Sequence, residues 1–444
     1  MLIFNNLFNS TWMQKKKCSG LSWLQLWDWI ALFHRVVYIL LFIALGFAIP
    51  FKNRMATWVI GFMVINWAAE FRFWAKLKRI LQEKHRQHIL LFTILYFIYL
   101  IGLLYTKNIE YARFDITVKL SLLVFPLLFA TIDGRVFSFL RINYIFLTYI
   151  AGCLAASIVC LANAMIRYGE TGDAGAFFYM QFSILHHSGY LSMFINFAIV
   201  LVVFLTFKHL HIFKRWHLAL ITFLLVFFNL MVVLLSSKMG ILSLLVIYLL
   251  MTLIFFFSKA TRLKAIFPLV MMATVILFVL SLPQTMARVE RTTNVVENIG
   301  SLKPDAEEST GERVLVWQSA WNIILQHPLF GVGTGDVKDA LLEEYSTQGI
   351  KYAYSRNLDA HNQYLQTYLS VGVIGFIVLV TMLVWPGIIA FRRKDYIYFF
   401  FVLLFGMNIL TESMFENQAG IVFYAFFNAL LFYYMPAEKN RGLS

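Results

Sequence analysis

The chain has 444 residues, of which 60% are hydrophobic and 14% are charged. Soluble domains contain roughly 45–50% apolar and about 25% charged residues, so this composition excludes an ordinary soluble protein and indicates a polytopic membrane protein. The 37 Lys and Arg residues exceed the 23 Asp and Glu residues, which gives a net charge of +14. The three cysteines are too few for a disulfide framework, and we interpret them as packing residues: Cys18, Cys153 and Cys160.

A membrane-spanning helix needs about 20 apolar residues, and the chain offers about 12 such segments. The sequence therefore predicts an all-α polytopic membrane protein. In chain order, we predict the spans near residues 33–50, 55–70, 88–104, 116–131, 143–166, 190–207, 217–235, 239–257, 264–282, 363–385, 396–412 and 419–435. The N-terminal region lacks the apolar core and cleavage site of a signal peptide, so we expect the first hydrophobic helix to direct insertion.

Lys and Arg residues concentrate in alternate short loops. Examples are Lys76 and Lys78 after the second predicted span, Arg215 before the seventh and Arg392 after the tenth, whereas the opposite loops hold few, such as Lys52. Because positive residues accumulate on the cytoplasmic side, we expect both termini in the cytoplasm. The basic total then reflects topology, and we expect no nucleic-acid binding.

The longest polar interval of the chain lies at residues 283–361, between the ninth and tenth predicted spans, and the topology places it outside the cytoplasm. Helical spacing of apolar residues predicts a helix over 312–326, preceded by Gly311 and ended by Pro328, and a second helix over 336–345. We expect a helical cap inserted into a single membrane domain that comprises residues 1–444.

His361 stands where this polar loop meets the tenth span. A neutral imidazole there can accept a proton from an incoming hydroxyl, so His361 is a candidate catalytic base. The alternative is a histidine that only helps Asn362 to cap the following helix.

Four basic residues form a second set: Arg313, Arg288, Arg291 and Lys238. Guanidinium groups match phosphate oxygens, and a diphosphate leaving group needs its charge neutralised by a metal or by such cations. Because no Asp-x-Asp pair occurs in the outer loops, we expect a diphosphate site without metal or other cofactor. The alternative is ordinary loop charge, which fits Arg291 and Lys303 better than Arg313 and Lys238.

Glu412 and Glu416 have a spacing that places both on one face of a helix. They could orient an acceptor hydroxyl, pair with an arginine or form a solvated helix end. The pair His186 and His187, with Tyr190, could line the same outer cavity, although two histidines alone make a poor metal site. We assign no metal ligands.

The glycines of residues 331–335 lack a preceding strand, so they do not predict a nucleotide-binding loop. Tight turns after Pro328 explain them.

Several of these motifs together resemble the O-antigen ligase and polymerase superfamily, whose members are bacterial GT-C type membrane glycosyltransferases. They are the run Gly311-Glu312-Arg313 with Trp317, the run His327-Pro328-Leu329-Phe330-Gly331-Val332-Gly333, and His361-Asn362 followed by Gly372 and Gly375. The motif resemblance covers about residues 236–375. It implies a GT-C-like fold and the use of undecaprenyl-diphosphate-linked glycans on the periplasmic side of the inner membrane.

The resemblance also implies roles for individual residues. His361 matches the essential histidine that activates the acceptor hydroxyl, and Arg313 matches an essential arginine that binds the lipid diphosphate. Lys238 follows Ser237 where the family commonly has Ser-Arg, so the charge is kept and the bidentate fork is lost. The run from His187 to Tyr190 is similar to a family His-Pro-x-Tyr run without its proline.

We therefore expect an O-antigen ligase that transfers glycan from undecaprenyl diphosphate to lipid A-core oligosaccharide, with inversion and without metal. His361 would be the base, and Arg313 and Lys238, helped by Arg288, would hold the diphosphate. A polymerase and a protein O-oligosaccharyltransferase of the same superfamily remain alternatives, because the motifs do not encode the acceptor. A lipid-linked glycan transporter is a remote alternative, since transporters place charges near the midplane and show internal symmetry.

Overall fold

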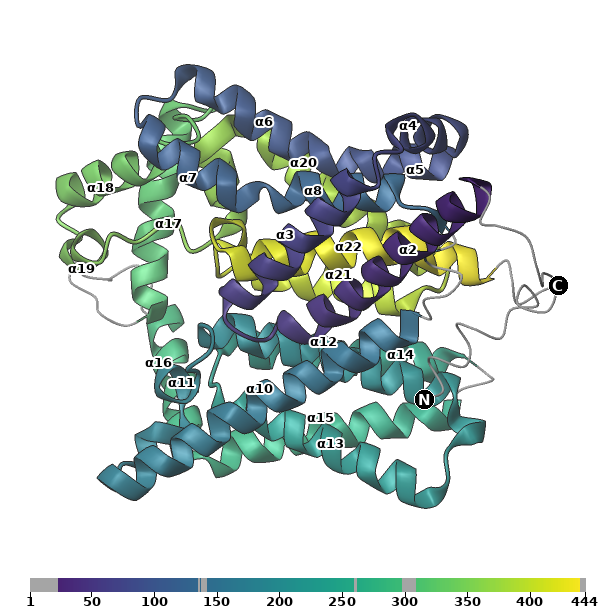
Figure 1. Cartoon of the computed structure of the whole chain (residues 1–444). Helices are drawn as coiled ribbons and strands as arrows, with labels where there is room; N and C mark the ends of the chain where they lie inside the picture. The colour runs from purple at the N-terminus through teal and green to yellow at the C-terminus, as the bar shows by residue number, and fades with distance from the viewer. Residues whose placement is uncertain (1–22, 135, 137–141, 259–261, 298–308, 440–444) are drawn as a thin grey trace.

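The computed structural model describes residues 23–134, 136, 142–258, 262–297 and 309–439. Within these ranges every regular element is helical (Figure 1), which confirms the predicted all-α class. Nine of the described segments are long and apolar enough to cross a membrane. The protein is therefore an integral membrane protein. Cys18 and Lys303 lie outside the described residues.

The nine candidate spans correspond to predicted segments. They are α2 (Trp23–Ala48), the series α5 (Lys84–Ile89), η1 (Leu90–Thr93), α6 (Ile94–Gly102) and η2 (Leu103–Tyr105), the pair α7 (Ile109–Lys119) and α8 (Ser121–Thr131), α10 (Ile142–Thr171), α12 (Ser188–Lys208), α13 (Arg215–Leu234), α14 (Lys238–Phe257), the pair η5 (Arg262–Ala265) and α15 (Ile266–Ser281), and α20 (Gln363–Arg392).

The three other predicted spans are also helices: α3 (Asn53–Ala69), α21 (Tyr396–Asn408) and α22 (Gln418–Lys439). Helices α3 and α21 are shorter than the nine spans. The count of twelve spans stays a prediction.

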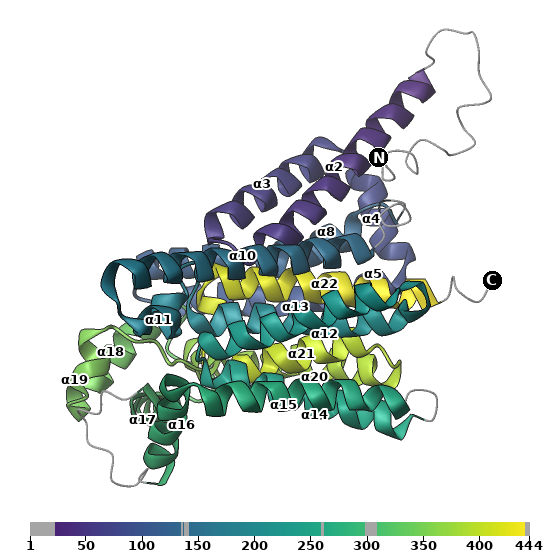
Figure 2. The same ribbon diagram turned by 90° about the horizontal axis from the view of Figure 1, so that it is seen from below.

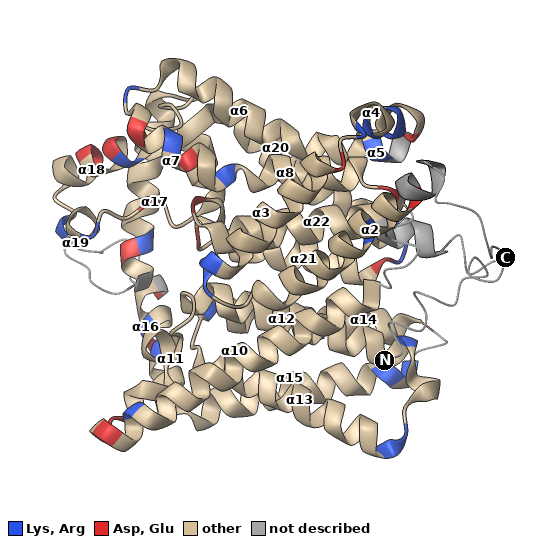
Figure 3. Cartoon of the chain, in the orientation of Figure 1, with Lys and Arg blue, Asp and Glu red and all other residues tan. Residues whose placement is uncertain are grey.

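The bundle has two different ends. The helices between α15 and α20 gather at one end, and α4 (Phe73–Gln82), α5, the start of α2 and the end of α22 lie at the other (Figure 1 and Figure 2). Many Lys and Arg residues lie at α4 and α5, with some acidic residues beside them, and both signs of charge also occur at the first end (Figure 3). The orientation of the two ends in the membrane stays a prediction.

The cap consists of four helices in its described part: α16 (Pro283–Glu297), α17 (Ser309–Gln326), α18 (Val337–Gln348) and α19 (Lys351–Ser355). It has its own hydrophobic core, in which Val316, Ala320, Leu341 and Tyr345 are fully buried, and Leu369 of α20 joins this core. Each such buried aliphatic or aromatic side chain contributes about 1.5–3 kcal/mol. The packing of Leu369 into this core therefore joins the cap to the bundle.

The predicted cap differs from the observed one in extent. Helix α17 begins at Ser309, so the prediction that Gly311 precedes the helix is wrong. Helix α18 corresponds to the second predicted helix and extends three residues further. The sequence analysis missed α16, whose composition is polar, and α19, which has five residues.

Helix α20 is broken at Val371 and Gly372, and the glycine-rich loop after α17 fills the break. Val332 N and Gly333 N donate to the carbonyls of Leu369 (2.7 Å) and Ser370 (3.1 Å). These carbonyls would otherwise bond along the helix. Gly372 has a φ of 69°, and a Cβ atom there would lie 2.0 Å from the Leu329 carbonyl oxygen. Loop and helix therefore meet backbone to backbone, which accounts for their glycines.

Candidate functional site

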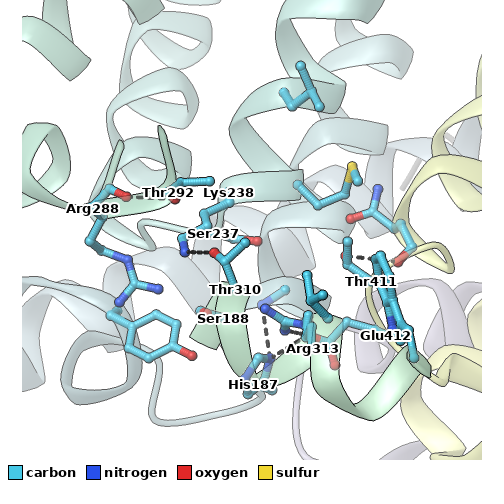
Figure 4. A pocket seen from close by; sticks show the side chains of 17 residues that line it. His187, Ser188, Ser237, Lys238, Arg288, Thr292, Thr310, Arg313, Thr411 and Glu412 are labelled. Atoms are coloured by element: carbon cyan, nitrogen blue, oxygen red, sulfur yellow. Dashed lines mark hydrogen bonds and ion pairs between the residues drawn. The ribbon is translucent and has the colours of Figure 1, made fainter. Parts of the chain in front are cut away.

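A pocket lies at the cap end of the bundle and is lined by charged side chains from separate parts of the chain (Figure 4). His187 precedes α12, Lys238 begins α14, Arg288 belongs to α16 and Arg313 to α17, and Glu412 lies in the turn after α21. The apolar side of the pocket includes Tyr179, Leu242 and Trp317. The fold thus assembles groups that are far apart in the sequence.

Arg313 and Glu412 form the central ion pair of the pocket. Arg313 Nη2 lies 2.8 Å from Glu412 Oε1, and the side chains are only 20% and 11% exposed. Burial opposes ionisation of Glu412, but the adjacent His361 and Arg313 outweigh it and lower the pKa of the carboxyl group to about 2. Glu412 is therefore a carboxylate at physiological pH.

His361 approaches the other oxygen of the same carboxylate. Its Nδ1 atom lies 3.6 Å from Glu412 Oε2 and 3.5 Å from Asp359 Oδ1. Burial alone would lower the pKa of His361, but the two carboxylates raise it above its ordinary value. His361 does not belong to the residues that line the pocket in the described part of the chain. Glu412 connects it to Arg313.

The backbone of His361 is strained. Its φ is 43°, a left-handed conformation that costs a residue other than glycine about 1–3 kcal/mol and that clusters at functional sites. The amide of His361 donates to Asp359 Oδ1 at 2.8 Å, and that of Ala360 donates to Gln366 Oε1 at 3.2 Å. These bonds fix the imidazole at the entrance to α20.

The other two cations reach the pocket from different sides. Lys238 Nζ donates to Thr310 Oγ1 at 2.5 Å, and the Ser237 hydroxyl accepts from Gly240 N as the cap of α14. The guanidinium group of Arg288 lies 3.9 Å from the centre of the Tyr179 ring, a cation–π contact that leaves its N–H edge available.

Arg291 is exposed and is not a lining residue of the described pocket. Its position agrees with ordinary loop charge, the alternative that the sequence leaves open for it.

His187 is the second imidazole near Glu412. Its Nδ1 atom accepts from Gly189 N at 3.3 Å, as a cap of α12, and lies 3.9 Å from Glu412 Oε1. Burial lowers the pKa of His187, so the ring is neutral and carries its proton on Nε2. Tyr190 is buried with its ring 6.4 Å from that of His187. His186 points elsewhere, since its Nε2 contacts the Phe51 carbonyl oxygen.

A comparison with family models matches residues 221–380 to the O-antigen ligase family. This match supports the predicted resemblance to the O-antigen ligase and polymerase superfamily. The matched segment includes Lys238, Arg288, Arg313 and His361, whereas His187 and Glu412 lie outside it. The match supports a function of the ligase or polymerase type on lipid-linked glycans, without separating the two. A comparison with curated proteins gives no match.

Glu416 lies apart from the pocket, and the prediction that it shares a helical face with Glu412 is wrong. Helix α21 ends at Asn408, and the turn that follows directs the two side chains to different partners. Glu416 Oε1 lies 2.8 Å from Lys119 Nζ, which also pairs with Asp115. This second cluster anchors the turn that carries Glu412.

Asn362 adopts the capping role that the sequence offers as the simpler alternative. Its Oδ1 atom accepts from Tyr364 N at 2.9 Å and from Leu365 N at 3.2 Å, which ends the strained segment and starts α20. The side chain is buried. Asn362 thus positions its neighbour His361 through the backbone.

The sequence analysis missed Asp359, Tyr179 and the buried pair Asp115 and Lys119. A signal existed for the last two, because an acidic and a basic residue four positions apart within an apolar helix are costly unless they are paired. In the described residues, no group of three or more His, Cys, Asp or Glu side chains could hold a metal ion.

Proposed function

We propose that the protein is an O-antigen ligase of the bacterial inner membrane. It transfers a glycan from undecaprenyl diphosphate to a hydroxyl group of lipid A-core oligosaccharide, with inversion at the anomeric carbon. The observation that carries the proposal is the meeting of Arg313 and His361 at the two oxygens of Glu412. A candidate phosphate-binding cation and a candidate general base thereby lie beside the same carboxylate.

The cations act on the leaving group. When the bond between the anomeric carbon and the phosphate oxygen breaks, the diphosphate keeps the electron pair and gains charge. Arg313, Lys238 and Arg288 border the pocket in which this charge would develop. Fixed cations at such a place stabilise the transition state more than the ground state, so the site supplies its own charge neutralisation.

His361 acts on the acceptor. Its Nδ1 faces Asp359 and Glu412, which leaves Nε2 to accept the proton of the sugar hydroxyl as the oxygen attacks the anomeric carbon. The products are the new glycosidic bond, undecaprenyl diphosphate and a protonated His361 that then releases its proton. Enclosure between cap and bundle limits attack by water.

The topology supplies the location of the reaction. With the basic α4 and α5 end in the cytoplasm, the cap and its pocket lie in the periplasm. Both termini lie in the cytoplasm.

The test is reconstitution of purified protein with lipid-linked glycan and three acceptors in parallel: lipid A-core, lipid-linked repeat units and a peptide that contains Ser and Thr. We expect a new glycosidic bond on lipid A-core, and a loss of about 10²- to 10⁴-fold in rate in His361→Ala. A chelator leaves the rate unchanged.

Three outcomes contradict the proposal. Product on repeat units or peptide alone identifies a polymerase or a protein glycosyltransferase. Translocation of glycan without a new bond identifies a transporter. Full activity in His361→Ala removes the base assignment.

A further inference from the structure

Glu412 has two partners at unequal distances. Its Oε1 atom is 2.8 Å from Arg313 Nη2, a charge-assisted hydrogen bond, whereas its Oε2 atom is 3.6 Å from His361 Nδ1, beyond hydrogen-bonding distance. Within the described part of the chain, His361 Nδ1 is buried and has no hydrogen-bond partner. His361 Nδ1 and Glu412 therefore face each other without a hydrogen bond, while Glu412 is bonded to Arg313.

We infer that Glu412 couples donor binding to the base: when a diphosphate oxygen takes the Arg313 N–H, Glu412 is released and closes on His361 Nδ1. Glu412 is then a positioning residue, which acts through His361 and does not touch the reacting atoms. The inference rests on the proposed function, because it needs a diphosphate at Arg313.

The surroundings of Glu412 leave it few other partners. The residue is buried, and a buried carboxylate that loses its cation must find another donor close by. His187 Nδ1 already accepts from Gly189 N, so a neutral His187 has no proton there to offer. Of the two imidazoles beside Glu412, His361 is therefore the one whose Nδ1 can donate to it.

The backbone around Glu412 is fixed, so only its side chain needs to move. Gln363 N donates to Ile409 O at 2.8 Å on one side of the turn, and Phe415 N donates to Gln363 Oε1 at 2.6 Å on the other. Glu416 is tied to Lys119. A side-chain rotation between Arg313 and His361 thus requires no rearrangement of the bundle.

Asp359 is the other carboxylate that faces His361 Nδ1, at 3.5 Å, but it is already engaged by the amide of His361. The charged and titratable groups around the imidazole are therefore Asp359, Glu412, Arg313 and His187. Of these, only Glu412 also bonds to a cation that we assign to the diphosphate. His361 then becomes a stronger base only when the donor is bound, which disfavours proton transfer in the absence of donor.

The experiment measures the pKa of His361 in the full-length protein, from the pH dependence of deuterium exchange at the imidazole C2 position, followed by mass spectrometry. The probe is undecaprenyl diphosphate without a glycan. We expect this ligand to raise the pKa of His361 by about one unit, because a closer carboxylate favours the imidazolium ion. In Glu412→Gln the rise is largely lost.

The negative charge of the ligand also acts on His361, and the Glu412→Gln variant separates this direct effect. An equal rise in wild type and Glu412→Gln overturns the inference and leaves the proposed function intact. If radiolabelled undecaprenyl diphosphate does not bind to the protein, both the inference and the proposed function are contradicted.

A second pair of variants keeps the test valid if Glu412→Gln does not fold. Arg313→Gln releases Glu412 without ligand, so the pKa of His361 rises in the unliganded protein and responds little to the probe. The double variant Arg313→Gln/Glu412→Gln distinguishes release of the carboxylate from simple loss of the arginine charge. A rise that persists in the double variant contradicts the coupling.

Discussion

The residue that organises the candidate site is Glu412, although its sequence context is unremarkable. Its two oxygens lie 2.8 Å from Arg313 and 3.6 Å from His361. A buried carboxylate that stays ionised is stable only between such partners. The cation and the imidazole are thereby held at a fixed separation before any substrate arrives.

This arrangement predicts the pH dependence of transfer. The pKa of His361 is raised, although burial opposes this, since Glu412 and Asp359 favour the protonated ring. The proposed base is the neutral ring, so we expect kcat/KM to rise with pH through a midpoint above about 6.5, the ordinary value for histidine. Replacing Glu412 with Gln removes one of these carboxylates, lowers the pKa and moves the midpoint to lower pH.

Initial rates of glycan transfer between pH 5.5 and 9 measure this midpoint. Glu343→Gln is the control, because Glu343 is exposed on α18 of the cap, and we expect it to leave the midpoint unchanged. A midpoint at or below the ordinary histidine value in the wild type contradicts the assignment of His361.

At the scale of elements, the break in α20 joins the cap to the bundle. The Val373 amide, which cannot complete a helical bond across the break, donates to the Pro328 carbonyl oxygen at 3.1 Å. The loop that follows α17 therefore replaces part of the α20 hydrogen-bond ladder. Because α17 carries Arg313 and α20 begins next to His361, this junction also sets their relative position.

Gly372→Ala is expected to destabilise the junction strongly. Gly372 has a φ of 69°, and an added Cβ would lie 2.0 Å from the Leu329 carbonyl oxygen, so both conformation and space oppose alanine. We expect a loss of about 2 kcal/mol or more, seen as a lower midpoint of thermal unfolding in detergent and a lower transfer rate.

The same helix offers a matched control in Gly387→Ala. A Cβ at Gly387 would meet Val402 Cγ1 at 3.7 Å, an ordinary contact, and this glycine has no positive φ. Alanine there is neutral or stabilises the helix by about 0.5–1 kcal/mol. Equal melting temperatures for the two variants would show that the junction does not depend on Gly372.

At the scale of the whole molecule, hydropathy and charge predict much of the architecture. Apolar length places the spans because each spanning backbone must satisfy its hydrogen bonds internally, and the helix that carries Arg313 follows from its apolar spacing. The sequence could not reveal that Glu412 and Glu416 turn to different partners. Their separation depends on a turn whose path is set by contacts with α7 and α20, which no local pattern encodes.

For His361 and Lys119, too, the sequence predicts part of the structure and long-range contacts decide the rest. His361 is predictable as a candidate base from its position at the end of a polar loop, but its left-handed backbone is imposed by Asp359 and Asn362. Lys119 lies inside the fourth predicted span, and the structure buries it with Asp115 and Glu416. Its pairing with Asp115 could be expected from the spacing, but the sequence does not show that the distant Glu416 joins the pair.

The last prediction concerns the orientation of the bundle in the membrane. Ser346 is exposed on α18 of the cap and Gln82 is exposed on α4 at the opposite end. With the three native cysteines replaced by Ser, we introduce Ser346→Cys and Gln82→Cys separately. A membrane-impermeant maleimide should label Ser346→Cys in intact spheroplasts, because the proposed topology places the cap in the periplasm, and should label Gln82→Cys only after the membrane is permeabilised. The reverse pattern would place the pocket in the cytoplasm, where the positive-inside rule and a periplasmic transfer reaction would both fail for this protein.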